Sequence, residues 1–352
     1  GNGMDPLDIV DRYGADSLKF TLAFMTAQGQ DILLAEEDFR FGSKFANKIW
    51  NAARYLLMNL EGREFIPLEQ IELREIDKWI YHRLNETVKR VDRAIKSYRF
   101  NEASQAVYEF FWSDFCDWYI EASKISLYSD DDAEKNRAVS LLIGLLEESL
   151  RLLHPFLPFV TEEIYQKLPE GKGHEHLITA PYPAEDTSRE HPETAAQFEL
   201  LQEAIRSVRT LRSEFTIPPE KQLRVAVQTD TGFAGTDFFH QHRDLMAFLT
   251  NSQELTIGDS VDSTDGAVPV AGNGYEVFVY IKEAIDVAKE VEKLQKERGK
   301  MEKLAQSTDK KLRNSGFTDN APAEVVEKER EKLREFQDRL AKVERYLSQL
   351  AE

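Results

Sequence analysis

The sequence of 352 residues is poor in cysteine, in long apolar runs, and in glycine and proline. Its one cysteine, Cys116, excludes an internal disulfide and a zinc site built from several cysteines, and it fits a reducing, cytosolic compartment. No apolar run approaches the roughly 20 residues that span a bilayer, and the N-terminus lacks the pattern of a signal peptide. The 17 Gly and 12 Pro exclude collagen-like and low-complexity chains. We therefore expect a cytoplasmic protein without a membrane segment.

Negative charge predominates in the chain, but it is unevenly distributed. The 45 Lys and Arg against 63 Asp and Glu give a net charge of −18, which argues against a nucleic-acid partner because phosphates would be repelled. Residues 1–60 hold six basic and eight acidic residues, and residues 284–352 hold sixteen and fifteen. The remaining 23 basic and 40 acidic residues lie in 61–283, at net −17. The argument against nucleic acid therefore applies mainly to the middle of the chain.

One window, 39–60, contains no acidic residue. It combines four cations (Arg40, Lys44, Lys48 and Arg54) with five aromatic rings (Phe39, Phe41, Phe45, Trp50 and Tyr55) and with amides that include Asn47 and Asn51. Cations bind phosphates, while amides and flat rings suit unstacked bases. The alternative is an ordinary amphipathic helix whose aromatic stripe faces the core, which composition alone favours.

Helical patterns dominate the first half of the chain. Asp5-Pro6 predicts the start of a helix that ends at Gly14, and Asp16 can cap a second helix from Ser17 to about Ala27. From about 41 to 168, apolar residues at 3.6-residue spacing predict five amphipathic helices, the later four near 76–95, 101–124, 132–153 and 160–168. Helices with such short connections form an antiparallel bundle.

The second half is predicted to contain a small α/β subdomain and a coiled coil. A surface connection over 169–195 leads to a helix near 194–215. A helix near 237–249 and four strand-like runs follow, with Asn273-Gly274 as a hairpin turn: 223–228, 254–257, 267–270 and 275–281. Core positions then alternate in steps of three and four over 287–312 and 326–350, around a break at 314–322. These heptads predict an antiparallel coiled-coil hairpin, so the fold class is mainly α.

Motifs that carry catalysis are missing from the sequence. It contains no Gly-rich phosphate loop and no Gly-x-Ser-x-Gly elbow. His174 and His176 lie close together, but a flexible loop with only Glu175 as a further ligand indicates a solvated loop, so we expect no metal site. Cys116 lies mid-helix among aromatic residues and is expected to be buried and inert. We expect no active site within this chain.

Several segments together resemble the valyl-tRNA synthetase family of class I aminoacyl-tRNA synthetases. The opening GNGMDPLDIVDRYGADSLKFTLA is similar to the segment after the KMSKS loop of that family. Further resemblances run in the family's order along the chain: GQDI (29–32), FANKIWNAARYLLMNL (45–60), FWSDFCDWYIEASK (111–124), HPFLPFVTEEIYQKL (154–168), IRSVRTLRSEFTIPPEKQL (205–223) and NSGFTDNAPAEVVEKEREKL (314–333). The FCDWYIEASK stretch and the coiled coil favour the valyl type over the leucyl and isoleucyl types.

This resemblance implies a division into four parts: a stem-contact segment (1–40), an anticodon-binding helical bundle (41–190), a small α/β subdomain (191–283) and a tRNA-binding coiled-coil arm (284–352). It implies that the whole enzyme attaches valine to its tRNA with ATP and Mg. The nucleotide-binding, editing and KMSKS elements of the family are absent from the sequence. We therefore expect this chain to be the C-terminal part of such an enzyme, without cofactor, inactive alone and monomeric.

The resemblance also places anticodon contacts on the acid-free window, and this favours a tRNA contact for its polar face. Candidate side chains there are Arg40, Lys44, Asn47, Lys48, Asn51, Arg54 and Tyr55, with Tyr55 available to stack on a base. Trp50, Ile49 and Leu56 are expected in the core.

In the arm, which by resemblance touches the outer corner of the tRNA, the candidates are Lys293, Lys296, Arg298, Lys300, Lys303, Lys310, Lys311 and Arg313. Because alternating charges are normal on coiled coils, solvated surface cations are the alternative for each of them. Arg298 falls on a heptad core position, where a salt bridge across the hairpin competes with a tRNA contact.

A helical scaffold that uses its coiled coil for protein–protein contacts is the rival function. The two functions differ in salt dependence, since binding to tRNA weakens steeply as salt rises.

Overall fold

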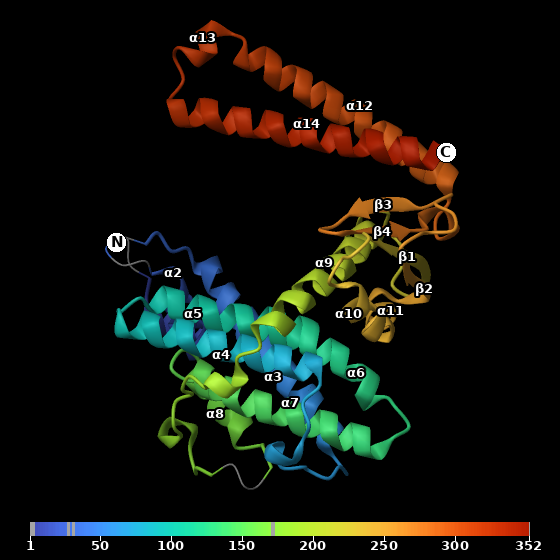
Figure 1. The fold of residues 1–352 in the computed structure, drawn as a ribbon. Coiled ribbons are helices and arrows are strands. Elements are labelled where there is room, and N and C mark those ends of the chain that lie inside the picture. The colour runs from blue at the N-terminus through green and yellow to red at the C-terminus, as the bar shows by residue number, and fades with distance from the viewer. Residues whose placement is uncertain (1–3, 27–28, 30–31, 170–172, 352) are drawn as a thin grey trace. The chain divides into compact units, whose positions relative to one another are not determined.

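The computed structural model describes residues 4–26, 29, 32–169 and 173–351. The chain forms two compact units, Gly1–Phe198 and Glu199–Glu352 (Figure 1). Helix α9, Pro192–Glu214, begins in the first unit and ends in the second. None of the described helices has the length and apolarity needed to cross a bilayer. The division of the chain into four parts stays a prediction.

The first unit is a bundle of helices, as predicted from the amphipathic pattern. Its helices are α1 Pro6–Tyr13, α2 Ala15–Met25, α3 Phe39–Leu60, α4 Glu75–Lys96, α5 Phe100–Glu109, α6 Glu121–Leu127, α7 Asp132–Leu153 and α8 Pro158–Tyr165. Ala27, the predicted end of α2, lies outside the described residues, as do Gln30 and Asp31 of the GQDI motif. Short 3₁₀ turns lie between the helices, at Glu36–Asp38, Leu68–Gln70, Leu177–Thr179 and Thr187–Arg189.

Asp16 caps a helix, but not the helix predicted from the sequence. It lies inside α2, and its two carboxylate oxygens accept hydrogen bonds from the backbone N–H groups of Phe159 (3.1 Å) and Val160 (2.7 Å) in the first turn of α8. Burial raises the pKa of Asp16, although the two N–H groups act in the opposite direction. This side chain therefore fixes α8 against α2 through a contact that spans more than 140 residues of sequence.

The predicted helix over 101–124 is one continuous helical run with an unpredicted middle. Between α5 and α6, Phe110–Ile120 is π-helical, and seven of its eleven side chains are buried. A π-helical turn is wider than an α-helical turn, so successive side chains fall out of the 3.6-residue pattern. The buried side chains recur mainly in steps of four and five residues instead, and this brings Cys116 into the core together with its aromatic neighbours.

A buried carboxylate joins three elements of this bundle. Asp77, in the first turn of α4, is 2% exposed. It accepts hydrogen bonds from the Tyr119 hydroxyl (2.8 Å) and the backbone N–H of Arg74 (3.0 Å), and it forms an ion pair with Arg137 of α7. Burial raises the pKa of Tyr119, so this hydroxyl stays protonated and donates a hydrogen bond to the Asp77 carboxylate.

Removing the cation of this network is expected to destabilise the first unit strongly. Arg137→Ala leaves the Asp77 charge buried without its partner, and we expect a loss of about 3 kcal/mol in the free energy of unfolding, measured in urea. Arg90→Ala removes the exposed ion pair with Glu109 and serves as the control, with a loss below about 0.5 kcal/mol. Equal losses in the two variants would contradict a structural role for the network.

The second unit contains the predicted α/β subdomain. Its strands are β1 Leu223–Thr229, β2 Ser252–Gly258, β3 Val268–Ala271 and β4 Tyr275–Val279, and its helices between β1 and β2 are α10 Thr236–Gln241 and α11 Arg243–Thr250. The strand order is β2-β1-β4-β3. β1 pairs parallel with β2 and antiparallel with β4, and β3 pairs antiparallel with β4. The predicted hairpin at Asn273-Gly274 is confirmed, with Gly274 at φ +83°.

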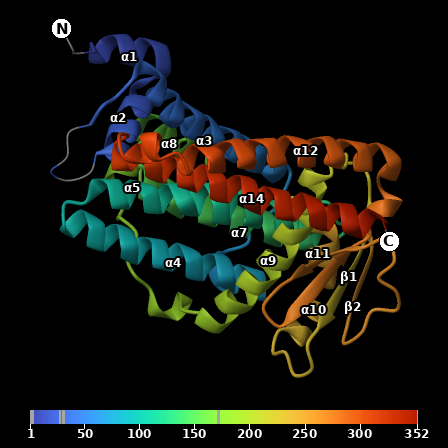
Figure 2. The ribbon, with the colours of Figure 1, turned by 90° about the horizontal axis from the view of Figure 1, so that it is seen from above.

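The coiled-coil hairpin is also confirmed. Helices α12, Val287–Leu312, and α14, Ala323–Ala351, lie side by side in both views (Figures 1 and 2), joined through the short α13, Ser315–Thr318. Predicted core positions are buried along the seam, among them Leu294, Val326, Val343 and Leu350. Two ion pairs cross between the helices, Lys311–Glu329 and Arg339–Glu297.

The end of α9 anchors the base of this hairpin. The rings of Phe215 and Tyr346 lie 5.0 Å apart, and the Glu214 carboxylate accepts hydrogen bonds from Lys342 and from the Tyr346 hydroxyl. Burial acts to raise the pKa of Glu214, but these two bonds outweigh it and lower the pKa below the ordinary value.

Acid is therefore expected to weaken this anchor. A carboxylate whose pKa is lower in the folded state stabilises the fold above its unfolded pKa, near 4.3, and loses that contribution as the pH falls through the folded pKa. We expect hydrogen exchange in the last turns of α14 to accelerate below about pH 4 relative to the middle of β1. In Glu214→Gln the exchange is already faster at pH 7, and acid changes it less. An identical acid response in both proteins would contradict this role.

Candidate nucleic-acid interface

One face of α3 is fixed in the core by aromatic rings. Phe45 is fully buried, and its ring centroid lies 4.8 Å from that of Phe20 in α2 and 4.8 Å from that of Tyr108 in α5. Gly42 faces α2 so closely that a Cβ there would lie 2.6 Å from the carbonyl oxygen of Ser17. These contacts fix the rotation of α3 about its axis, and thereby fix which of its side chains face solvent.

The opposite face carries a straight line of polar side chains, here called the α3 stripe. Its members are Arg40, Lys44, Asn47, Asn51 and Arg54, all exposed. Their spacing of four, three, four and three residues keeps them on one side of the helix, over about 21 Å. This line contains five of the seven candidates predicted in the window, and it ends at the exposed side chain of Met58.

The cations of the α3 stripe are not neutralised locally. Arg40, Lys44 and Arg54 form no ion pair with any residue in the described part of the chain, and α3 itself has no acidic residue. The Asn47 and Asn51 amides likewise have no hydrogen-bond partner among the described residues. Free cations and free amides on one face can bind phosphates and base edges without first breaking internal contacts.

Lys48, by contrast, lies beside the α3 stripe and is engaged within the bundle. Its ammonium nitrogen lies 2.8 Å from the Asp117 carboxylate and 4.9 Å from the centre of the Trp112 ring. Partial burial acts to lower the pKa of Lys48, but the bond with Asp117 raises it overall. Its predicted contact with tRNA stays a prediction, and that contact would compete with the Asp117 pair.

Tyr55 occupies the same flank as Lys48 and is also partly buried. Its hydroxyl lies 3.1 Å from that of Tyr128, and the Lys124 ammonium lies 5.8 Å from the centre of its ring. Burial raises the pKa of Tyr55, so the hydroxyl stays protonated at neutral pH. Stacking of this ring on a base stays a prediction.

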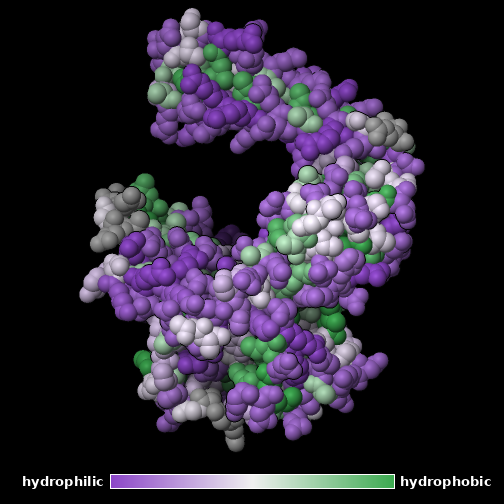
Figure 3. Space-filling view, viewed as in Figure 1, coloured by the Kyte–Doolittle hydropathy of each residue, from purple (hydrophilic) through white to green (hydrophobic). Residues whose placement is uncertain are grey.

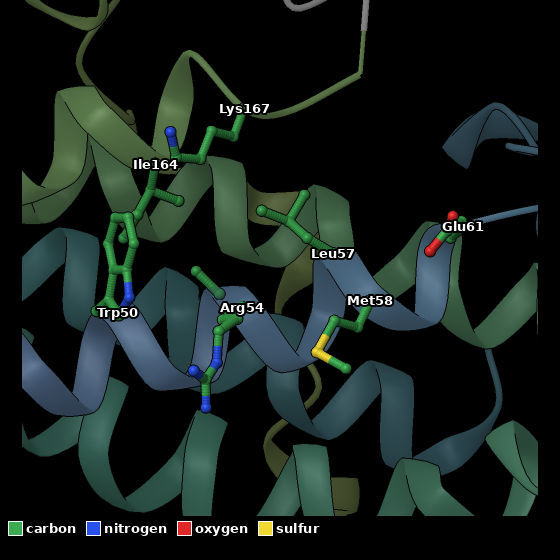
Figure 4. Close-up of a pocket in the computed structure, with 8 residues that line it drawn as sticks. Trp50, Arg54, Leu57, Met58, Glu61, Ile164 and Lys167 are labelled. Carbon is green, nitrogen blue, oxygen red and sulfur yellow. The ribbon is translucent and has the colours of Figure 1, made fainter.

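Trp50 departs from its predicted place in the core, whereas Ile49 and Leu56 are buried as expected. It lies on the flank of α3 that faces α8, and it is only partly buried because the two helices leave a pocket there. There it lines a surface pocket of about 250 Å³ with Leu57 and with Ile164 of α8 (Figure 4). Neither the pocket nor its cation Lys167, which lies in the turn after α8, could be identified from the spacing of residues in α3.

In the coiled-coil hairpin, the exposed lysines of α12 form a second line, here called the arm stripe. Lys293, Lys296, Lys300, Lys303 and Lys310 are all exposed and repeat in steps of three and four, with one seven-residue gap at Ser307. These positions point away from the seam with α14. Figure 3 shows the visible face of the hairpin as largely hydrophilic, with some apolar side chains among the polar ones. Lys289 continues the stripe and was missed in the sequence, although its spacing is the same.

The partners of the arm stripe differ along its length. Lys293 pairs with Glu290 (2.9 Å) and Lys296 with Glu292 (2.6 Å). Within the described residues, Lys300, Lys303 and Lys310 form no ion pair. The unpaired lysines therefore lie on the part of α12 nearer the hairpin turn.

Three further basic candidates of the arm lie off this line. Arg298 is exposed and lies 3.6 Å from Glu302 of its own helix. Of its two alternatives, the salt bridge across the hairpin is not formed with any described residue of α14, and the tRNA contact stays a prediction. Lys311 pairs across the hairpin with Glu329 (3.3 Å), and Arg313 pairs with Asp309 (2.8 Å).

Histidines and the cysteine offer no catalytic centre among the described residues. His176 lies 3.1 Å from the Glu162 carboxylate, but no group of three metal-ligating side chains occurs in the described parts of the chain. Gly171 and Lys172 of the histidine loop lie outside them. Cys116 is 6% exposed, and burial raises the pKa of its thiol to about 12.

Two family models match the chain. The "Anticodon-binding domain of tRNA ligase" matches residues 77–227, and the "Valyl tRNA synthetase tRNA binding arm" matches residues 286–351, which is the coiled-coil hairpin. Full-length relatives agree with these matches. The valine–tRNA ligase of Treponema denticola is 43% identical over 99% of this chain, and that of Treponema pallidum is 45% identical over 95%. The chain belongs to the valyl-tRNA synthetase family.

Within the valyl-tRNA synthetase family, the chain corresponds to part of the longer relatives. It spans 39% and 37% of the two Treponema proteins, and it matches the C-terminal region of such relatives. The α3 stripe precedes residue 77, so it lies outside the anticodon-binding match, whereas the arm stripe lies inside the arm match. A solved LeuRS–tRNA–LeuAMS complex of Agrobacterium radiobacter is 18% identical, with a TM-score of 0.41, over 65% of this chain and 24% of its own.

Thiol labelling tests the burial of Cys116. Because the thiol is buried and its pKa is near 12, a disulfide reagent at pH 8 is expected to leave the native protein unlabelled and to label one thiol after unfolding in guanidinium. Rapid labelling of the native protein, at the rate measured in guanidinium, would contradict the placement of this residue in the core.

Proposed function

We propose that this chain binds valine-specific tRNA, with the α3 stripe toward the anticodon loop and the arm stripe toward the outer corner of the tRNA. The observation that supports this most directly is the α3 stripe itself: three cations without ion pairs among the described residues and two free amides, in one line on a helix face fixed by the core. The α3 stripe is about 21 Å long, which matches the length of about six nucleotides at roughly 3.4 Å each along one strand of a duplex. The family supplies tRNA as the kind of ligand.

The net charge of −18 does not oppose this proposal. At physiological ionic strength, charges on the surface are screened beyond about 8 Å, so a phosphate responds to the side chains beside it rather than to the total. Along the α3 stripe itself those side chains are cations and amides. The acidic surface elsewhere disfavours docking of tRNA in other positions.

For the whole protein of which this chain matches a part, we propose attachment of valine to tRNA with ATP and Mg, in the cytoplasm and as a monomer. The valine–tRNA ligases that the chain resembles support the proposed activity. The residues that would bind ATP are not among the motifs of this chain, so we expect it to be inactive alone. A pyrophosphate exchange assay with valine tests this, and ATP-dependent exchange by this chain would contradict it.

Salt-dependent binding tests the proposed contact of α3. Valine tRNA is titrated in a filter-binding assay between 50 and 300 mM salt, with wild type and with Arg40→Ala/Lys44→Ala/Arg54→Ala. Each lost phosphate contact reduces the slope of log K against log salt by about 0.7, so we expect the triple variant to lose up to about 2 in slope. The control Arg90→Ala/Arg93→Ala/Lys96→Ala removes the same charge from α4 and is expected to keep most of the slope.

The two stripes are expected to differ in what they read. Wild type is expected to bind a tRNA with a substituted anticodon more weakly, and loss of the α3 stripe is expected to reduce this discrimination. Lys300→Ala/Lys303→Ala/Lys310→Ala is expected to weaken both tRNAs equally, because phosphates carry no sequence. If wild type binds neither tRNA, or if salt leaves its binding unchanged, tRNA binding by this chain is wrong and a protein-binding scaffold becomes the better account.

A further inference from the structure

The pocket between α3 and α8 lies directly beside the α3 stripe. Its walls are mainly apolar, formed by Trp50, Leu57 and Met58 of α3 and by Ile164 of α8 (Figure 4). Arg54, a member of the α3 stripe, lines the same pocket. The line of cations and the pocket therefore form one continuous surface on α3.

The pocket is small and open. Its volume of about 250 Å³ lies below the roughly 300–1,000 Å³ of sites that enclose a whole small molecule. It suits one flat ring, and it offers the partly exposed indole of Trp50 as a surface for stacking. The apolar side chain of Met58 is 69% exposed at the pocket, where it is available to contact a ligand.

Cations accompany the indole. The Lys167 ammonium lies 5.9 Å from the centre of the Trp50 ring and 2.5 Å from the Glu163 carboxylate. Because the Lys167 side chain is 46% exposed, a phosphate can take the place of Glu163 as its partner. Glu61 is the acidic residue of the pocket lining. It lies at the opposite end of the pocket from Trp50 (Figure 4), about 16 Å away along the axis of α3. The Trp50 end is thus the cationic end.

We propose that this pocket receives one unpaired base of the tRNA anticodon loop, stacked on Trp50, with its phosphates held by Arg54 and Lys167. The inference rests on the proposed tRNA binding and adds a base site on the α8 flank of α3, opposite to the flank of Lys48 and Tyr55. Stacking on an aromatic ring beside a line of cations is the usual way in which single-stranded nucleic acid is held.

Substitutions at the pocket test this site in the full chain. Trp50→Leu keeps an apolar side chain but removes the stacking surface, and we expect it to weaken binding of valine tRNA about tenfold or more. Phe100→Leu removes another exposed aromatic ring of the first unit and is expected to change binding less than twofold. Circular dichroism and thermal unfolding verify that each variant is folded.

A second variant guards against a folding defect of Trp50→Leu. Met58→Asp changes an exposed side chain and places a negative charge at the pocket, and we expect it to weaken binding about tenfold. Tyr98→Asp, at another exposed position of the first unit, is the control.

Abasic substitutions in the tRNA identify the base and separate this proposal from the previous one. We expect one abasic position in the anticodon loop to weaken tRNA binding by the wild type about tenfold. The same abasic tRNA is expected to bind Trp50→Leu no more weakly than the intact tRNA does. If wild type does not bind tRNA at all, the proposed function is wrong. If wild type binds and folded Trp50→Leu and Met58→Asp bind equally well, the tRNA proposal stands and the base pocket is overturned.

Discussion

Burial of one face of α3 is the constraint on which the candidate interface depends. The Phe45 ring, enclosed between Phe20 and Tyr108, and the close approach of Gly42 to Ser17 leave α3 a single rotation about its axis. A helix without these contacts would present its cations in many directions. With them, the α3 stripe lies in one line, and Trp50 and Lys48 are set on opposite flanks. Packing in the core thus determines the chemistry of the surface.

The same principle applies in the second unit with different parts. The heptad seam between α12 and α14 fixes the rotation of α12, and this directs the arm stripe away from α14. Ring packing and hydrogen bonds at Glu214 then fix the base of the hairpin to α9. In both units an apolar pattern of the sequence orients a basic pattern of the same helix. Segregation of this kind lets a chain of net charge −18 present two cationic lines.

Much of this arrangement could be predicted because it is periodic. Helices α3 and α7, the hairpin turn at Asn273-Gly274 and the coiled coil follow from repeats of apolar residues and from turn residues, all of which are local in sequence. The α3 stripe could be predicted for the same reason, since one period places its members on one face. Lys289 could have been found in this way and was missed.

Contacts between distant segments could not be predicted. Asp16 was expected to cap its own helix, but tertiary packing places it at the first turn of α8. The π-helical stretch removes the 3.6-residue pattern on which the prediction of a regular helix rests. Lys48 is engaged by Asp117, some 70 residues away, and Trp50 is left at the surface by a gap beside α8. Sequence periodicity determines which face a residue lies on, but the neighbouring elements determine whether that residue is free.

Lysine footprinting of the complex tests the central claim, which is that tRNA binds along the α3 stripe and the arm stripe. The chain is acetylated with a lysine-specific reagent, with and without saturating valine tRNA, and each lysine is quantified by mass spectrometry. The account predicts strong protection of Lys44, Lys300 and Lys303 and no protection of Lys96, which is well exposed on α4. Equal protection of Lys96 and Lys44, or none at either stripe when tRNA is bound, would contradict it.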